Sequence, residues 1–245
     1  MLSKLFSKIR FASFPSVVES NVGYRQLVDC DSFGNVPDIL SLHLMSHSDF
    51  KKINILAHEN FSWLKPWSVD FPNGFSLSRF SSSLGILSTR NDSGVPVYSF
   101  REYVSICMEK MRNDEAYFFK ICLDGEICGF ISISEIFRGC LCSGIIGYWI
   151  SKDYAGRSIM PTALAMLCDF AFDFLRLHRL EINICSDNTA SLRVVEKLSL
   201  RCEGLRKKYI YVNGHWSDHY CFALSVEDIC CGGILRRFEK GCTCV

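Results

Sequence analysis

A short polar loop, Asp153–Ser158, is the stretch of this chain best suited to hold an anion. Residues Tyr148–Ile150 before it are apolar and aromatic, as in a β-strand, and the residues after it have helical spacing. A helix N-terminus presents unpaired N–H groups and a partial positive charge, and Arg157 adds a cation. A phosphate-bearing ligand would therefore fit at Ala155–Pro161. Most strand-to-helix loops carry small residues merely in order to turn, and spacing alone favours that simpler interpretation.

The elements that would position the loop follow it along the chain. Apolar residues at the spacing of one buried helix face are Leu164, Leu167, Cys168, Ala171, Phe174 and Leu175. Pro161 suits the first turn of this helix, because its missing N–H has no helical partner there. A strand is predicted over 179–185. Asn188 or Asp187 would then cap a second helix that runs to about Leu198.

The other segments complete a mixed α/β domain. The predicted elements are a strand within 38–45, helices at about 50–60 and 100–111, strands at 116–123, 126–134 and 143–150, a hairpin of 200–212 with 215–224, and a short docked helix containing Ile229, Ile234, Leu235 and Phe238. Asp124-Gly125 and Asn213-Gly214 are typical hairpin turns. The first of them gives three consecutive antiparallel strands before the polar loop.

Composition predicts one substantial domain. The chain has 245 residues, 49% of them hydrophobic, and a net charge of +1, which argues against direct nucleic-acid binding. We expect an N-terminal extension at 1–37, a domain at 38–226 with an insertion or lid near 70–97, and a Cys-rich tail at 227–245.

The cysteines bear on location and on metal binding. Most of the 14 Cys lie within apolar segments, where free Cys behaves as a small hydrophobe. With no secretory signal pattern and no apolar run of about 20 residues, we expect a cytoplasmic protein without a transmembrane segment. No metal site is expected. His215 and His219 fall in a predicted strand, where an i, i+4 pair does not share a helical turn, and the tail cysteines lack the usual zinc spacing.

A set of short motifs, in order and spacing, resembles the GNAT acetyltransferases, and within them the ribosomal-protein-alanine N-acetyltransferases of the Rim type. The motifs are Gly147–Trp149, Gly156–Met160, Leu177–Glu181, Asp187–Ser191, Glu196–Leu198, Glu203-Gly204 and Tyr209–His219. The resemblance covers roughly residues 39–227. It implies the GNAT fold, a mixed and mostly antiparallel sheet flanked by helices. This sheet would splay at its centre between the strand of Tyr148 and the strand of Glu181.

The resemblance also implies acetyl-CoA as co-substrate, with its pyrophosphate in the polar loop. The family pattern Gln/Arg-x-x-Gly-x-Gly/Ala falls on Ala155, Ser158 and Met160, and the sequence differs from it at each position. Ser158 is the main departure, because Gly permits a positive φ and a close backbone approach that Ser resists. The coenzyme-binding residues implied are Trp149, Ile150, Ala155, Gly156, Arg157, Ser158, Ile159, Met160, Asn188 and Ser191.

Acetyl transfer to an amine requires that the amine lose a proton and that the leaving thiolate be stabilised or protonated. From the residues alone, Asn188 and Ser191 are best explained as a helix cap. The resemblance instead places Asn188 on the pantetheine arm and Ser191 near the thioester sulfur, as a candidate general acid. Glu135 is a candidate base in the acceptor channel, although a solvated strand-end charge is the simpler interpretation. Glu181, in a predicted strand whose alternation the sequence does not fix, is another candidate. Tyr148 and Tyr209 would orient the amine or relay its proton through water.

The acceptor side is expected to contain Trp63, Trp67 and Tyr209, with core or lid packing as an equal alternative for the two tryptophans. The resemblance implies transfer of acetyl to a protein N-terminal α-amine, with a ribosomal protein beginning with alanine as partner. One alternative is acetylation of a small-molecule amine or a lysine side chain. Another, suggested by Ala155 and Ser158, is a non-catalytic CoA-binding or ribosome-associated module with a degenerate pyrophosphate loop.

Overall fold

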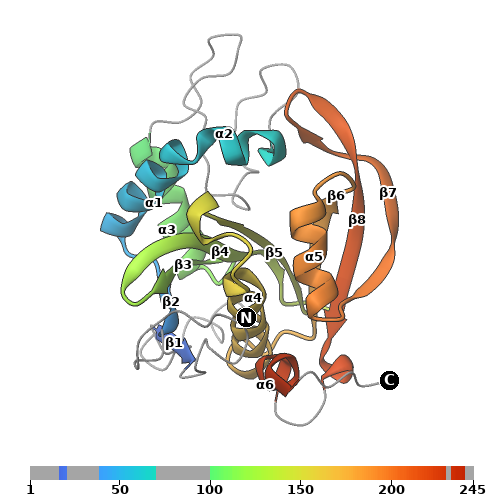
Figure 1. The fold of residues 1–245 in the computed structure, drawn as a ribbon. Coiled ribbons are helices and arrows are strands. Elements are labelled where there is room, and N and C mark those ends of the chain that lie inside the picture. The colour runs from blue at the N-terminus through green and yellow to red at the C-terminus, as the bar shows by residue number, and fades with distance from the viewer. Residues whose placement is uncertain (1–16, 21–38, 70–99, 230–232, 241–245) are drawn as a thin grey trace.

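The computed structural model describes residues 17–20, 39–69, 100–229 and 233–240 (Figure 1). Most of the expected N-terminal extension, all of the expected 70–97 insertion and the tail cysteines lie outside these residues. The strands are β1 (Val17–Ser20), β2 (Leu40–Leu44), β3 (Tyr117–Leu123), β4 (Glu126–Phe137), β5 (Ser143–Ile150), β6 (Arg179–Cys185), β7 (Arg201–Val212) and β8 (His215–Ser225). The helices are α1 (His47–Glu59), α2 (Phe61–Leu64), α3 (Phe100–Arg112), α4 (Ile159–Asp173), α5 (Thr189–Lys197) and α6 (Gly233–Lys240), with 3-10 turns η4 (Lys65–Trp67), η6 (Lys152–Tyr154) and η7 (Val226–Asp228).

The strands form one sheet in the order β1-β2-β3-β4-β5-β6-β8-β7. Neighbours are antiparallel except for β5 and β6, which are parallel and pair only from Ser143↔Arg179 to Ile145↔Glu181. Beyond that point these two fully described strands have no further pairs with each other. The predicted mixed, mostly antiparallel sheet with a central splay is therefore confirmed.

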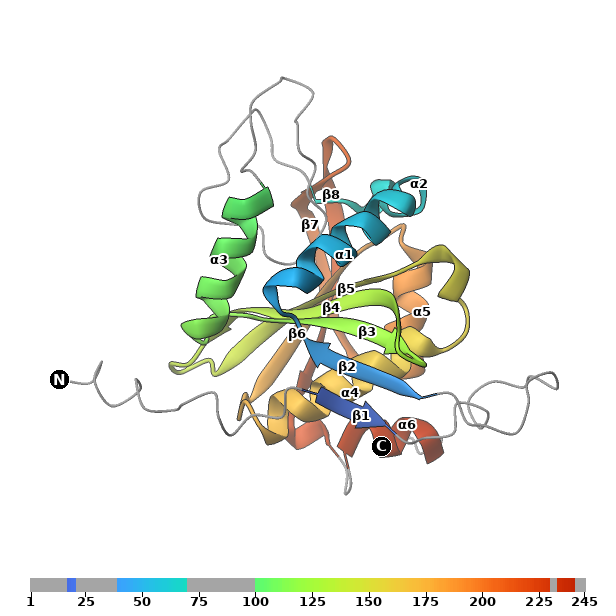
Figure 2. The same ribbon diagram turned by 90° about the vertical axis from the view of Figure 1, so that its left-hand side faces the viewer.

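Helices cover both faces of the sheet. We call the side of α1, α2 and α3 the α1 face and the side of α4, α5 and α6 the α4 face (Figure 2). Alternation along β3 and β4 sends Phe118 and Phe130 into the core beneath α1 and α3, and Phe119 and Ile131 into the core around α4. Each face thus has its own apolar core.

Helix α4 is more enclosed than its apolar spacing predicts. Thirteen of its 15 residues are buried, so the expectation of a single buried face was wrong. The reason is that α4 lies between the sheet and two further helices, α5 and α6, which cover its other sides. Phe174, expected on the buried face, follows the helix end and is 47% exposed.

Several boundaries follow from local capping. Helix α1 begins at His47, three residues before the predicted start, because Ser46 and Asp49 form a reciprocal capping box. Asn188, rather than Asp187, caps α5 by accepting a hydrogen bond from Ser191 N. Both predicted hairpins are confirmed, and the residues of each turn have the positive φ that a type I′ turn requires.

The predicted short helix at the end of the chain is confirmed as α6, except that Ile229 lies before it and caps the end of η7. Ile234 is fully buried, and Leu235 and Phe238 pack against the core around α4. Asp169 of α4 accepts hydrogen bonds from Ile234 N at 2.6 Å and Leu235 N at 3.0 Å. Among the described helices, none is long and apolar enough to cross a membrane.

Candidate active site

The polar loop ends at Ser158, which is the N-cap residue of α4 and has φ 58° and ψ 9°. This left-handed conformation costs a non-glycine residue about 1–2 kcal/mol. Gly156, two residues earlier, has φ +79° and open space where a Cβ would stand. Ser158 therefore keeps the positive φ that glycine adopts freely, and the loop leads directly to the free N–H groups of the first turn of α4.

A cation that was not predicted from the sequence lies at this helix N-terminus. Lys197, in the last turn of α5, donates from Nζ to Ser158 Oγ at 2.9 Å. Arg157 is in the same loop, with its guanidinium 5.5 Å from the Tyr154 ring centre. A pyrophosphate fits this set of groups, which consists of two cations, a helix N-terminus and a glycine with open space beside it.

Three predicted residues meet on the α4 face, where β5 lies beside α5. The Tyr148 hydroxyl donates to Ser191 O at 3.3 Å, and Ser191 N donates to Asn188 Oδ1 at 3.1 Å. Burial raises the pKa of Tyr148, so its phenol is protonated at neutral pH. Tyr148 is therefore a hydrogen-bond donor here and not a base.

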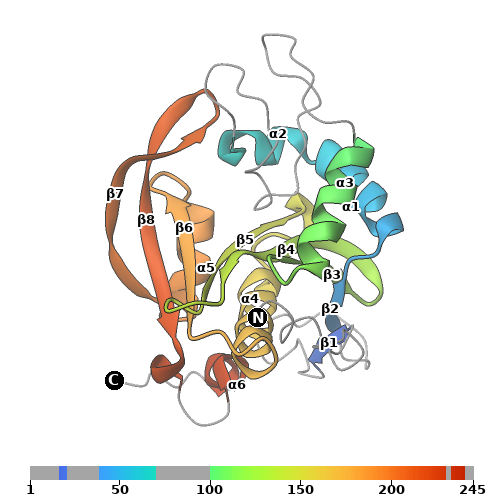
Figure 3. The same ribbon diagram turned by 180° about the vertical axis from the view of Figure 1, so that it is seen from behind.

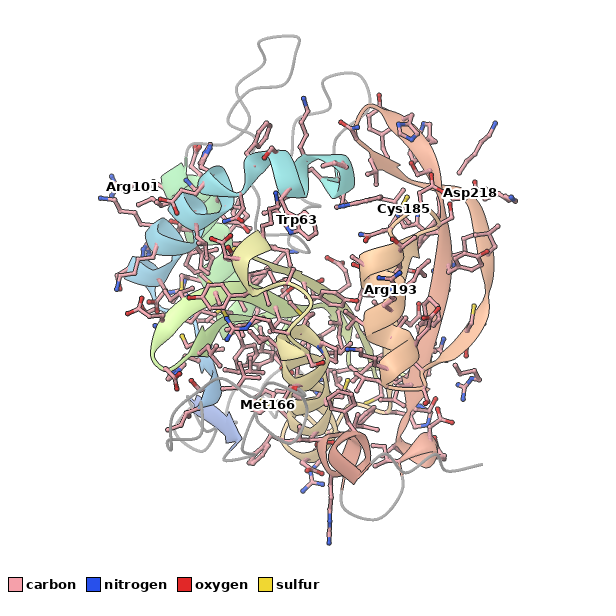
Figure 4. The ribbon with its side chains drawn as sticks, in the orientation of Figure 1. Trp63, Arg101, Met166, Cys185, Arg193 and Asp218 are labelled. Carbon is pink, nitrogen blue, oxygen red and sulfur yellow. The ribbon has the colours of Figure 1, made fainter. Side chains whose placement is uncertain are left out.

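At the end of β5, the consecutive side chains of Tyr148 and Trp149 lie on opposite faces of the sheet. Trp149 is 5% exposed and stacks on Phe130 in the core beneath α1 and α3, with ring centres 6.4 Å apart. Its side chain is thus directed away from Tyr148, and its backbone is the part that borders the splay. The carbonyl of Ile150 accepts a hydrogen bond from Trp63 Nε1 at 3.1 Å. Trp63 from α2 and Cys185 from β6 lie on the two sides of the separation between β5 and β6 (Figure 4).

The segment that contains both predicted tryptophans connects the two sides of the splay on the α1 face. Trp63 joins it to β5, as above, and also packs against the core beneath α1 and α3. At its other end, Ser68 O accepts a hydrogen bond from Asn213 N at 3.1 Å, and Val69 forms a bridge with Val212. Trp67, between these contacts, is partly exposed. The α2–η4 segment therefore reaches the tip of the β7–β8 hairpin.

The α1 face of β6, β7 and β8 carries a polar cluster around Arg206. This guanidinium donates to Tyr209 OH at 3.0 Å and Asn183 Oδ1 at 3.3 Å, and it pairs with Glu181 Oε2 at 3.4 Å. The Tyr209 ring also meets the ring of His219 edge to face, with centroids 6.2 Å apart. Of this cluster, Tyr209 was predicted on the acceptor side, and Glu181 was considered as a base. The polar residues that alternate with apolar ones in 179–185 were a signal, but the sequence does not say which face they occupy.

Glu135 is placed differently from the other catalytic candidates. It lies in an irregular part of β4, with φ 50°, and its side chain is 47% exposed. Its carboxylate is 3.5 Å from Lys110 Nζ of α3, on the α1 face, whereas Tyr148 and Ser191 meet on the α4 face. The structure does not bring these three candidates together. Within the described ranges, no group of three or more His, Cys, Asp or Glu side chains could hold a metal ion.

Comparisons with known proteins agree with this architecture. A family model described as an acetyltransferase (GNAT) domain matches residues 90–201. The Bacillus subtilis protein named "Probable N-acetyltransferase YjcK" is 35% identical over 141 residues, which are 57% of this chain and 78% of the relative. The Escherichia coli "[Ribosomal protein uS5]-alanine N-acetyltransferase" is 25% identical over 197 residues, covering 78% of this chain and 90% of the relative.

A solved structure extends the likeness to the fold. Mycobacterium smegmatis RimJ, in complex with CoA-disulfide, superposes with a TM-score of 0.69 at 26% identity, covering 83% of this chain and 89% of that protein. On the combined sequence and structural evidence, this chain belongs to the GNAT acetyltransferase family and is an acyltransferase.

Proposed function

We propose that this enzyme transfers acetyl from acetyl-CoA to the N-terminal α-amine of a protein, with a ribosomal protein that begins with alanine as the acceptor. The support is the similarity, over most of both chains, to an acetyltransferase named for alanine of ribosomal protein uS5 and to RimJ. Because ribosomal proteins are found in the cytoplasm, we propose that the enzyme acts there. The transfer of acetyl belongs to the family, and the choice of acceptor is our proposal.

The observation that carries the coenzyme part of the proposal is the N-terminus of α4. Bound acetyl-CoA supplies an activated thioester, and its pyrophosphate would be held by the N–H groups of Gly156–Met160 together with Arg157 and Lys197. Ser158 already has the left-handed φ that the family's glycine allows. This supports a functional pyrophosphate loop over the degenerate loop on which the non-catalytic alternative depends.

The contacts on the α4 face support roles for Asn188 and Ser191. We propose that Asn188 holds the pantetheine arm and that the Ser191 hydroxyl donates a proton to the departing sulfur. The Tyr148 phenol, protonated and bonded to Ser191 O, would fix the position of this turn of α5. Glu135 was expected as a candidate base; because it is paired with Lys110 on the α1 face, we propose instead that it attracts a cationic acceptor.

A second candidate acceptor, a small-molecule amine or a lysine side chain, is compatible with one contact at the acceptor side. The α2–η4 segment is bonded to the β7–β8 hairpin tip through Ser68–Asn213 and Val69–Val212. This link spans the side from which an acceptor would approach the splay, and it favours a slender acceptor over a folded protein surface. An unstructured N-terminus and a small amine both meet that requirement.

The test is a calorimetric titration with acetyl-CoA, followed by measurement of thiol release with three acceptors. The first is a peptide with a free N-terminal alanine, the second has a blocked N-terminus and one lysine, and the third is spermidine. We expect saturable binding of acetyl-CoA and thiol release with the first peptide. Release with only the second or third acceptor would replace the proposed substrate, and absence of binding at millimolar acetyl-CoA would contradict the coenzyme assignment.

A further inference from the structure

The strand β8 carries two buried polar side chains, Ser217 and His219, on the α1 face of the sheet. His219 pairs with Cys185 of β6, and Ala223 of the same strand pairs with Glu181. Directly paired residues in a sheet lie on one face, so His219 shares a face with the polar residues of β6. The apolar residues of β6 that alternate with them pack into the core on the α4 face. Figure 3 shows this side of β6 and β8, with α5 behind them.

His219 also lies at the level of the residues that meet on the opposite face. The last pair between β5 and β6 is Ile145↔Glu181. Tyr148 is three residues beyond Ile145, and Cys185, the partner of His219, is four residues beyond Glu181. Each strand rises about 3.3 Å per residue, so the two positions are at similar heights on either side of the splay.

The hydrogen bond of His219 fixes which ring nitrogen is available. The residue is 3% exposed, and its Nδ1 is 2.9 Å from Ser217 O. A carbonyl oxygen only accepts, so Nδ1 carries the hydrogen and Nε2 has a free lone pair. Among the described residues no hydrogen bond involves Nε2, and the buried hydroxyl of Ser217 also has no partner there. Two polar groups on this face are thus available to a ligand.

The charges around the ring agree with a neutral imidazole. Burial lowers the pKa of His219, partly opposed by the Ser217 carbonyl and by Asp218. Tyr209 and Arg206 face it from β7, and Cys185 from β6. A neutral imidazole with an available Nε2 can accept a proton near pH 7.

We propose that His219 Nε2 accepts the proton of the acceptor ammonium group, with Ser217 Oγ as a second acceptor for its N–H groups. This inference rests on the proposed transfer to an amine, and not on which amine is used. As Nε2–H forms, one ammonium N–H bond breaks, and the freed amine attacks the thioester carbon. As C–N forms and C–S breaks, the second proton passes to the departing sulfur through the Ser191 hydroxyl. His219 then returns its proton to solvent.

The test uses His219→Asn, because the asparagine amide can still donate to Ser217 O from the position of Nδ1 while Nε2 is lost. His215→Asn is the matched control, since His215 is exposed on the same strand and its Nδ1 is 3.3 Å from Asn213 O. Whichever of the three acceptors the parent acetylates is used. We expect kcat/KM at pH 7 to fall about 100-fold in His219→Asn and to stay unchanged in His215→Asn.

The pH profile separates a proton acceptor from a structural histidine. In the parent, kcat/KM should rise with pH through an inflection below 6.5, the ordinary value for histidine. In His219→Asn the acceptor must arrive already deprotonated, so the inflection should move up toward about 8 for an α-amine. An unmoved inflection overturns the proposal, whether or not the rate falls.

Two measurements keep this result distinct from failure of the proposed function. Calorimetry should give the same acetyl-CoA affinity for the parent and His219→Asn, because the substitution is on the face opposite α4. Nitrogen-15 NMR of the parent should show His219 neutral with its hydrogen on Nδ1 at pH 7. A charged ring or a hydrogen on Nε2 would overturn the proposal. If the parent acetylates none of the three amines, the proposed function fails while the NMR result still tests His219.

Discussion

At the scale of single residues, Ser158 carries a conformation that glycine would adopt without steric cost. Replacing it should remove about 1–2 kcal/mol of left-handed strain, while the greater freedom of glycine in the unfolded chain returns about 0.4–1 kcal/mol. Ser158→Gly is therefore expected to raise the free energy of unfolding by up to about 1.6 kcal/mol, measured by urea denaturation. Ser158→Ala keeps the Cβ and should show no gain. Equal stability of the two variants would contradict the strain argument.

Lys197 is the residue whose charge should matter most for phosphate binding. Lys197→Gln removes the ammonium that bonds to Ser158 Oγ. A charge-assisted contact of this kind is worth about 1 kcal/mol at a partly exposed site, so acetyl-CoA affinity should fall about 5-fold.

Calorimetry at low and high salt checks this expectation, because screening should shrink the difference between parent and variant. Lys207→Gln is the control, since Lys207 lies on β7 and pairs with Asp218 away from the loop. If both substitutions weaken binding equally, net charge explains the effect and the local contact does not.

The residues of the site were predictable to different degrees. The position of the polar loop and the Asn188 cap could be predicted because local chain order determines a strand, a turn and a helix cap, whereas the site roles of Asn188 and Ser191 stay predictions. Lys197 and His219 could not be assigned in this way. Their roles depend on α5 lying beside the start of α4 and on which face of β8 is polar, and both are non-local facts. Glu135 is a residue that was predicted in the site but is paired with Lys110 of α3. The sequence contains no signal for this ion pair, because it also depends on how distant segments pack.

At the scale of elements, Asp49 connects α1 to the sheet. Its carboxylate accepts hydrogen bonds from Ser46 N and Oγ and pairs with Lys120 Nζ of β3 at 2.8 Å. Burial alone would raise the pKa of Asp49, but the hydrogen bonds from Lys120 and Ser46 outweigh it and lower the pKa to about 2, from an ordinary 3.8. A lowered carboxyl pKa contributes stability above the unfolded value, and that stability is lost as pH falls toward 2.

Asp49→Asn should therefore reduce the free energy of unfolding at pH 7 by about 2 kcal/mol. The difference between parent and variant should shrink between pH 4 and pH 2, as the parent loses the same contribution. Urea denaturation at several pH values measures this. Glu109→Gln, on the exposed side of α3, is the control and should follow the parent throughout. A difference that is constant with pH would mean that packing, and not charge, is responsible.

Helix α6 depends on a close approach between Gly233 and Asp169. A Cβ on Gly233 would lie 2.8–3.0 Å from the carboxylate atoms of Asp169, and the backbone there has φ +90°. Gly233→Ala should displace the carboxylate from Ile234 N and Leu235 N, with a loss of about 1–2 kcal/mol. Hydrogen exchange of α4 amides should accelerate as α6 undocks. Arg236→Ala, at an exposed position of the same helix, should change stability by less than about 0.5 kcal/mol.

The order of the elements could largely be predicted from the sequence, and their environments less so. Hairpin turns at Asp124-Gly125 and Asn213-Gly214 are determined by local chemistry, and both were found. The burial of α4 was underestimated because an apolar stripe indicates only the face that meets the sheet. Ala163 and Ala165 could have belonged to either an exposed or an enclosed side, and both are fully buried because several elements pack around α4.

At the scale of the whole molecule, the sheet consists of two parts joined by a short parallel contact. The part from β1 to β5 and the part made of β6, β8 and β7 share only the pairs from Ser143↔Arg179 to Ile145↔Glu181. Further contacts are Tyr148–Ser191 on the α4 face and the Ser68–Asn213 link on the α1 face. A ligand between β5 and β6 would touch both parts, so its binding should stabilise the molecule as a unit.

Acetyl-CoA at about 100 times its Kd should therefore raise the free energy of unfolding by about 2.7 kcal/mol, or Tm by about 5–10 °C. Hydrogen exchange should slow at the amides beyond the paired region, in 146–150 of β5 and 182–185 of β6, because ordering the splay suppresses local opening. Lys197→Gln should show a smaller Tm shift at the same concentration. Protection of 156–160 with no change in 182–185 would mean that the coenzyme contacts one part only. That result would contradict a site built from both sides of the splay, and with it the placement of Ser191 beside the reacting sulfur.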